Sequence, residues 1–188
     1  KSALRGAMRG EVADDEATRR EAARDTSLFE RMPKMVVYPE DANDVSEIVK
    51  VVGAERKRGT AVSLAARAGG TDMSGGPLTD SVVVSFMKHM NHMGEVILRQ
   101  EPQDFVAAGF AVTQPGVFYR DFEKATLEKG LILPSYPASR EIAAMGGIVA
   151  NNSGGERTLE YGQTEKYVEE LDVVLSDGSQ TTLKALTP

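Results

Sequence analysis

The strongest chemical signal in this sequence is a glycine-rich stretch near its middle. It reads Arg67-Ala68-Gly69-Gly70-Thr71-Asp72-Met73-Ser74-Gly75-Gly76-Pro77, and four of these eleven residues are glycine. Glycine enters positive-φ conformations that other residues avoid, so such a loop can turn its backbone N–H groups inward. Successive inward N–H groups form a concave site that suits a phosphate or pyrophosphate. A flexible connecting loop without a ligand is the alternative that this stretch alone leaves open.

Two familiar phosphate-binding motifs are absent from this loop. No Lys-Ser or Lys-Thr follows the glycines, as a P-loop requires, and there is no Gly-x-Gly-x-x-Gly of a Rossmann turn. The loop lies between two short apolar runs, 61–66 and 81–86, which are each predicted to be a buried strand. It therefore joins strand to strand rather than strand to helix, and an anion would be bound by another architecture.

A second cluster of small residues follows in the C-terminal half. It reads Ala143-Ala144-Met145-Gly146-Gly147-Ile148-Val149-Ala150-Asn151-Asn152-Ser153-Gly154-Gly155, with Tyr161-Gly162 soon after. Small residues over such a length indicate that another part of the molecule packs close to this backbone. Close packing of helices or a sheet would explain most of the cluster. It does not explain the Asn-Asn-Ser-Gly-Gly end, because those residues favour turns and offer side-chain hydrogen bonds.

Hydrophobic periodicity predicts the elements that position the first loop. A strand is expected over 35–38, and an amphipathic helix follows from capping residues at 41–44 to a stop at Gly59. The strand over 61–66, the glycine-rich loop and the strand over 81–86 come next. The first half is therefore predicted to be a small β-α-β-loop-β lobe.

The second half has the same mixed character without an internal repeat. The elements expected there are strands over 95–101 and 105–112 about a turn at 102–104, a helix over 117–127 that Gly130 ends, and strands over 168–176 and 180–186. The last two strands flank Asp177-Gly178, a strong hairpin signal. Residues 1–32 carry mixed charge with sparse apolar positions, so we expect a solvated lead-in segment with one short helix.

Composition narrows the classes of function. The chain has 188 residues, enough for one sizeable domain or two small lobes, and a formal net charge of −6 without a basic run, which argues against nucleic-acid binding. It has no cysteine, which excludes disulfides, thiolate metal sites, a Cys nucleophile and a cysteinyl cofactor link. His89 and His92 lack a third nearby ligand, so no metal site is predicted. We expect a cytoplasmic protein without an integral membrane segment.

Together these segments resemble the flavin-binding domain of the vanillyl-alcohol oxidase superfamily, the PCMH-type FAD domain. The nearest branch is that of the FAD-linked dehydrogenases of D-lactate, glycolate and 2-hydroxyglutarate. The similarity runs in order from about Asp25 to Leu186, and the residues that carry it are Asp25-Thr26-Ser27, Pro33, Pro39, Arg67-Ala68-Gly69-Gly70-Thr71, Ser74-Gly75-Gly76, Gln114-Pro115-Gly116-Val117, Pro137-Ala138-Ser139, Gly146-Gly147, Asn151-Asn152-Ser153-Gly154, Tyr161-Gly162 and 173–178.

The resemblance implies an α+β fold in which two small α/β subdomains, of about 33–90 and 91–188, close on one FAD. The first loop would wrap the pyrophosphate, and the later segments would line the rest of the cofactor. The implied FAD-binding residues are Arg67, Ala68, Gly69, Gly70, Thr71, Asp72, Met73, Ser74, Gly75, Pro137, Ala138, Ser139, Gly146, Gly147, Asn151, Asn152, Ser153, Gly154, Tyr161 and Gly162. Relatives that attach FAD covalently often carry His at the position of Thr71, or Cys later, so the FAD is expected to be non-covalent.

The resemblance also implies an FAD-dependent oxidoreductase, a dehydrogenase or oxidase that oxidises a 2-hydroxy acid by hydride transfer to FAD. Quinones, flavoproteins or dioxygen would accept the electrons. The sequence stops before the C-terminal part of the family's FAD domain and before its substrate-binding cap domain. We therefore expect a truncated domain, and no catalytic residue is named; core or surface roles are at least as consistent with Tyr161 and Arg140.

Two other functions stay open at this point. One is a MurB-like, NADPH-dependent flavin reductase, and the other is a non-catalytic domain that holds no flavin when isolated. The Pro-Ala-Ser and Asn-Asn-Ser-Gly-Gly segments favour the hydroxy-acid enzyme over the first alternative. Strand edges exposed by a missing part of the sheet would favour a homodimer. Peripheral membrane attachment through a partner also stays open.

Overall fold

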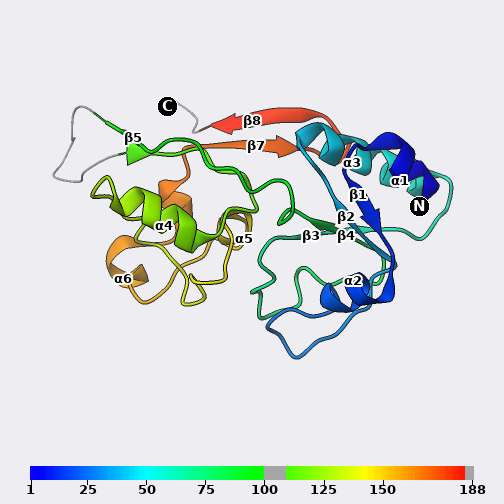
Figure 1. The fold of residues 1–188 in the computed structure, drawn as a ribbon, viewed down its shortest axis with the longest axis horizontal. Coiled ribbons are helices and arrows are strands. Elements are labelled where there is room, and N and C mark those ends of the chain that lie inside the picture. Colours follow the sequence, from blue (N-terminus) through cyan, green and yellow to red (C-terminus); the bar gives the residue numbers. More distant parts are fainter. Residues whose placement is uncertain (100–108, 185–188) are drawn as a thin grey trace.

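The computed structural model describes residues 1–99 and 109–184 of the chain. A four-stranded sheet with three helices forms one end of the molecule, and a mainly helical region forms the other (Figure 1). The elements of the first end are α1 (Ser2–Ala7), β1 (Glu11–Ala13), α2 (Glu16–Glu21), β2 (Met35–Tyr38), α3 (Ala42–Lys57), β3 (Leu64–Arg67) and β4 (Val82–Ser85). The predicted β-α-β-loop-β order is confirmed by β2, α3, β3 and β4.

The four-stranded sheet has the order β1-β2-β4-β3. Strand β4 runs parallel to both β2 and β3, whereas β1 pairs antiparallel with β2 at the edge. Valine dominates the two central strands, and Val36, Val37 and Val83 are almost completely buried. Buried strands of this kind are continuously apolar because both faces of the sheet are covered.

The first 32 residues are part of this fold, so the prediction of a solvated lead-in segment is wrong. Leu4 and Met8 of the α1 region are buried in the same cluster as Val37 and Ile48, and β1 extends the sheet. The sequence interpretation failed because two or three apolar side chains suffice to dock so short a helix. The short helix expected in this segment is α2, and Asp15 caps its start by accepting a hydrogen bond from Thr18 N (2.9 Å).

Helix α3 follows the prediction closely. Asp41 caps its N-terminus by accepting hydrogen bonds from Asn43 N (2.9 Å) and Asp44 N (3.1 Å). The chain leaves the helix through Gly59, whose φ of +85° is the left-handed conformation that ends many helices. From this helix the buried Ile48 packs in one cluster with Val37, Val82 and Val84 of the sheet.

The second end of the molecule has its own apolar core. It contains β5 (Ile97–Leu98), β6 (Gly109–Phe110), α4 (Tyr119–Leu127), α5 (Met145–Ala150), α6 (Thr158–Tyr161) and the 3-10 turn η1 (Thr164–Tyr167). Its buried cluster consists of Val117, Tyr119, Tyr136, Ala143, Met145 and Ile148. Tyr119 donates a hydrogen bond to Leu133 O (2.8 Å), and burial raises the pKa of its hydroxyl.

Two strands predicted in this half are shorter than expected. β5 and β6 pair antiparallel over only two residues each, Ile97 with Phe110 and Leu98 with Gly109. The predicted turn at 102–104 lies outside the described residues. The helix expected over 117–127 is confirmed as α4, and Gly130 follows it with a φ of +72°.

The hairpin at the C-terminal end connects the two halves. Strands β7 (Glu170–Val174) and β8 (Gln180–Lys184) pair antiparallel about a turn in which Gly178 has a φ of +83°, as Asp177-Gly178 predicted. The hairpin reaches back to α3 (Figure 1), where Ser46 Oγ donates to Gly178 O and Gln180 Nε2 donates to Asn43 Oδ1 (3.0 Å). The division into subdomains of about 33–90 and 91–188 remains a proposal. The hairpin belongs to the second of these subdomains but contacts α3 of the first.

Candidate functional site

The first glycine-rich loop leaves β3 and returns to β4, strand to strand as predicted. Gly70 and Gly75 have φ values of +68° and +87°, the conformations for which glycine is suited. Within the described part of the chain, the backbone N–H groups of residues 69–73 donate no hydrogen bond. Residues 69–72 are partly buried, whereas Met73 is exposed. Such a run of free N–H groups is what an anion-binding loop requires.

The one carboxylate in the loop is occupied by the loop itself. Asp72 Oδ2 accepts hydrogen bonds from Gly76 N (2.6 Å), Ser74 Oγ (2.8 Å) and Ser74 N (3.1 Å). These bonds, that from Gly76 N above all, hold the pKa of Asp72 below its ordinary value. The negative charge of Asp72 is therefore bound on the side of residues 74–76, and the N–H groups of 69–73 stay free for a ligand.

Arg67 lies against the back of the loop. A side-chain carbon on Gly70 would lie 2.7 Å from Arg67 Cζ, so the guanidinium occupies the space beneath that glycine. Burial lowers the pKa of Arg67, while the charge of Asp25 acts in the opposite direction. Arg67 Nη1 is buried and finds no hydrogen-bond partner among the described residues. Arg67 thus places a positive charge directly under the loop.

The second glycine cluster meets the first loop at close range. A side-chain carbon on Gly69 would lie 2.5 Å from Ile142 O and 3.3 Å from Ala144 N. The same construction on Gly147 would lie 3.8 Å from Ala68 Cβ, and on Gly146 it would lie 2.5 Å from Pro115 Cβ. At Gly69 and Gly146 only a residue without a side chain allows so close an approach, whereas a side-chain carbon at Gly147 would make an ordinary contact.

Residues 137–139 lead directly into this contact. Ser139 O accepts hydrogen bonds from Ala143 N and Ile142 N (2.9 Å each), and Pro137 O accepts from Arg140 N (3.0 Å). The structure thus brings together four of the segments that the sequence singled out. These are the first loop, the 114–116 turn, residues 137–139 and the start of the second glycine cluster.

The remaining predicted site residues have contacts elsewhere. Residues 151–154 form a turn that packs on residues 158–167, the stretch that contains Tyr161 and Gly162. Asn152, with a φ of +45°, donates to Glu165 Oε2 (3.0 Å) and accepts from Glu165 N (2.9 Å). Ser153 O accepts from Thr164 N and its hydroxyl, and Tyr161 O accepts from the Tyr167 hydroxyl. The recorded contacts of these residues, and those of Asn151, Gly154 and Gly162, do not involve the first loop.

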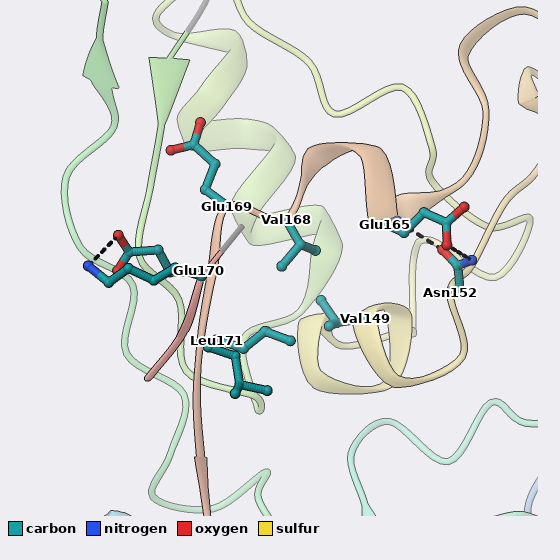
Figure 2. A pocket seen from close by; sticks show the side chains of 9 residues that line it. Val149, Asn152, Glu165, Val168, Glu169, Glu170 and Leu171 are labelled. Carbon is teal, nitrogen blue, oxygen red and sulfur yellow. Dashed lines mark hydrogen bonds and ion pairs between the residues drawn. The ribbon is translucent and has the colours of Figure 1, made fainter. Parts of the chain in front are cut away.

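A groove of about 350 Å³ lies beside this turn, between α5, η1 and the hairpin (Figure 2). The sequence did not predict it. Val149, Val168 and Leu171 supply apolar lining, while Glu165, Glu169 and Glu170 contribute carboxylates. Three acidic side chains disfavour a phosphate, so this groove is a poor candidate for the anion site despite its size.

A contact that the sequence did not reveal holds the first loop from outside. Thr26 Oγ1 donates to Thr71 O (3.0 Å) or Asp72 O (2.8 Å), and Thr26 N donates to Asp72 O (3.1 Å). Thr26 precedes Thr71 by 45 residues in the chain. Its only sequence signal was its place in the Asp25-Thr26-Ser27 segment.

The two histidines do not form a metal centre with their neighbours. His89 Nε2 lies 3.1 Å from Glu11 Oε1, and Lys88 Nζ lies 2.6 Å from the other oxygen of the same carboxylate. Over residues 1–99 and 109–184, no group of three His, Cys, Asp or Glu side chains is close enough to hold a metal ion. In the same ranges, no helix is both long and apolar enough to cross a membrane.

The chain is an α+β domain in which the first glycine-rich loop lies against the segment that leads into the second glycine cluster. A family model described as "FAD binding domain" matches residues 33–184. The chain therefore belongs to the FAD binding domain family, whose cofactor is FAD.

Several curated relatives are enzymes of 2-hydroxy acids. The chain is 31% identical over 173 residues to D-2-hydroxyglutarate dehydrogenase of Pseudomonas putida. The aligned region makes up 92% of this chain and 16% of that enzyme. It is 34% identical to the glycolate oxidase subunit GlcD of Bacillus subtilis, over 81% of this chain and 30% of the relative. With D-lactate dehydrogenase of Archaeoglobus fulgidus it shares 32% identity, over 77% and 29% of the two chains. The chain therefore spans less than a third of the length of these relatives.

Solved structures confirm the fold. Alkyldihydroxyacetonephosphate synthase aligns with 93% of this chain and 35% of its own at a TM-score of 0.70 and 22% identity. Xylooligosaccharide oxidase from Myceliophthora thermophila aligns with 97% of this chain and 36% of its own, at a TM-score of 0.73 and 18% identity. At such low identity these likenesses show the PCMH-type α+β fold and nothing of the substrate.

Proposed function

We propose that this chain is the FAD-binding portion of a flavin-dependent oxidoreductase that oxidises a 2-hydroxy acid. The observation that carries the proposal is the row of free N–H groups at 69–73, beside which residues 142–144 pack against Gly69. The names of the curated relatives, which act on D-2-hydroxyglutarate, glycolate and D-lactate, support the substrate class.

The first loop would hold the pyrophosphate of FAD by its backbone. The formal net charge of −6 gives the molecule as a whole no attraction for an anion, so local dipoles must supply it. Residues 69–73 offer five N–H donors, and Arg67 adds a positive charge beneath them in a partly buried position. Neighbouring residues 68, 74 and 75 would shape the loop.

The second cluster would line the rest of the cofactor. Gly147 lies beside Ala68 of the first loop, and residues 137–139 lead into residues 142–144, which pack on Gly69. The small side chains of these segments would leave room for a close approach of the ligand. Residues 151–154, Tyr161 and Gly162 would contribute by shaping the turn behind that segment. We propose non-covalent binding, because Thr71 cannot form the linkage of a histidine and the chain has no cysteine.

In the complete enzyme, bound FAD would accept a hydride from the α-carbon of the hydroxy acid. This chain's share of that work is to bind and orient the cofactor. Residues that contact the substrate are assigned to the part of the enzyme that this chain does not span. The electron acceptor would be a quinone, a flavoprotein or dioxygen. A homodimeric assembly and a cytoplasmic location are further parts of this proposal.

The proposal is tested by the visible absorption spectrum of the purified chain after incubation with FAD and desalting. We expect a flavin band near ~450 nm that elutes with the protein and is released by acid, as a non-covalent flavin should be. A chain that stays colourless after incubation with excess FAD would contradict the proposed site. A flavin that remains on the acid-precipitated protein would contradict non-covalent binding.

A further inference from the structure

We propose that Asp25 and Thr26 form a clamp that fixes the direction of the N–H groups in the first loop. The inference rests on the proposed FAD site and adds positioning residues to it. Both residues precede the part of the chain, 33–184, that the family model matches. A segment outside the matched domain would thus determine how well that domain binds its cofactor.

The first step of the argument is the geometry of the peptide bond. The Thr26 hydroxyl lies within hydrogen-bond distance of both Thr71 O and Asp72 O and donates to one or the other, while the Thr26 backbone N–H donates to Asp72 O. In a trans peptide the N–H of the next residue points away from that carbonyl, and the structure contains no cis bond among its described residues. Because the two carbonyls face Thr26, the N–H groups of Asp72 and Met73 point to the opposite side.

The second step is the position of Asp25. Its Oδ1 accepts a hydrogen bond from Ser27 N (2.8 Å), which fixes the turn that presents Thr26. Its Oδ2 is buried and without a partner among the described residues, as is Arg67 Nη1. The charge of Asp25 acts on the pKa of Arg67, against the effect of burial, without an ion pair between the two side chains in the described part of the chain. The geometric role of Asp25 is therefore to fix the turn that presents Thr26 to the loop.

The third step is the rigidity of the segment that carries the clamp. Its two ends are joined where Arg31 N donates to Ala23 O (2.9 Å) and where Arg24 Nε donates to Glu30 Oε2 (3.0 Å). Ala23, at its base, is completely buried. Near its tip, Phe29 packs against the loop, 3.1 Å from where a side chain on Gly75 would begin. A segment held in this way can restrain a glycine-rich loop that has few bonds of its own.

The test compares Thr26→Val with Thr26→Ser and with Thr60→Val. Valine keeps the shape of threonine but loses the hydroxyl donor, whereas serine keeps the donor. Thr60 is exposed and its hydroxyl contacts only Glu55 (3.2 Å), so Thr60→Val is a matched control away from the loop. Each variant is titrated with FAD, and the motion of its 69–73 amides is measured by ¹⁵N relaxation without FAD.

We expect Thr26→Val to bind FAD roughly fivefold to twentyfold more weakly, the effect of losing hydrogen bonds that orient two donors. The relaxation of the ligand-free protein should show larger motion at residues 72 and 73. Thr26→Ser should restore both properties, and Thr60→Val should leave them as in the wild type. Rescue by serine separates orientation of the loop from a general loss of packing.

The two proposals fail in different ways. A wild-type chain that binds no FAD contradicts the proposed function, while the relaxation data still decide whether Thr26 restrains the loop. A wild-type chain that binds FAD, with Thr26→Val equal to it in affinity, overturns the clamp. Unchanged motion at residues 72 and 73 in Thr26→Val overturns the clamp as well.

Discussion

Arg67 acts on the first loop from behind, and Gly70 is the residue that makes this arrangement feasible. The guanidinium fills the space where any side chain of residue 70 would begin, and the same residue needs a positive φ. Two independent demands for glycine thus fall on one position. The sequence predicted a loop of this kind but gave no sign of which glycine was indispensable.

We predict that Gly70→Ala weakens FAD binding by roughly tenfold or more and lowers stability by about 1–3 kcal/mol, because the new carbon displaces Arg67 and strains the backbone. Gly130→Ala is the matched control, since Gly130 also has a positive φ but no atom lies within 4 Å of the added carbon. The control should lose stability without losing FAD affinity. Equal affinities of the two variants, measured by titration, would show that the space beneath Gly70 is unimportant.

Asp72 gives the loop a dependence on pH. Its pKa is lowered in the folded chain, first by the hydrogen bond from Gly76 N, so its stabilising effect is complete above the unfolded value of about 3.9 and disappears as pH falls through the folded value. We predict that Asp72→Asn has a melting temperature about 2–4 °C below the wild type at pH 7. This difference should shrink below about pH 4. A difference that is the same at pH 7 and pH 3 would exclude this role of the carboxylate.

At the scale of the elements, the buried carboxylate of Asp44 holds α1, β1 and α3 together. Its Oδ1 accepts from Arg9 N, and its Oδ2 accepts from Gly10 N and Glu40 N, each at 2.9 Å. Arg9 and Gly10 belong to the first 32 residues. Asp44, which joins Arg9 and Gly10 to the rest of the fold, therefore lies in α3, a helix that the sequence predicted correctly. The sequence did not predict that Asp44 would bind these two residues.

We predict that Asp44→Asn destabilises the chain by about 2–3 kcal/mol, because the amide NH₂ group would face backbone N–H donors and leave them without acceptors. Asp14→Asn, at an exposed aspartate paired with Lys1, is the control and should stay within about 0.5 kcal/mol of the wild type. Urea unfolding of both variants gives the comparison. A loss of less than about 0.5 kcal/mol in Asp44→Asn would contradict this account of how the N-terminal elements are attached.

The sequence predicted best those elements whose signals are local. Helix α3 has a cap, a periodic apolar face and a terminal glycine within one stretch, and all three were found in the structure. The Asp177-Gly178 hairpin is equally local. Strand β1 and the burial of Leu4 depend on pairing with residues far along the chain, which a pattern in 1–32 could not reveal. The lengths of β5 and β6 were not predicted for a related reason, since alternation in sequence does not determine how far two strands pair.

The same distinction applies to the site at the scale of the whole molecule. The composition of each glycine cluster indicated close backbone packing, and the contact of Gly69 with Ile142 and Ala144 shows what is packed. The sequence also grouped Asn152 and Tyr161 with this site, whereas the structure gives them partners in 163–167. Thr26 was missed as a contact of the loop because its two acceptors are backbone carbonyls, which have no signature in sequence.

In the proposed site the first loop contacts residues 142–144 of the second half, so ligand binding should stabilise the molecule as one unit. Residues 69–73 follow the sheet of the first core, and Gly146-Gly147 begin α5 in the second. We predict that FAD at about 100 times its dissociation constant stabilises the chain by about 2.7 kcal/mol and raises the melting temperature by about 5–10 °C.

Riboflavin is the matched control for this experiment, because it carries the flavin ring without the phosphates. If the N–H groups of 69–73 hold the pyrophosphate, riboflavin should raise the melting temperature little at the same concentration, and ADP should produce part of the effect of FAD. Thermal unfolding followed by circular dichroism measures all three ligands. Stabilisation by riboflavin equal to that by FAD would show that the ring, and not the first loop, dominates binding, and would remove the pyrophosphate from the account of this site.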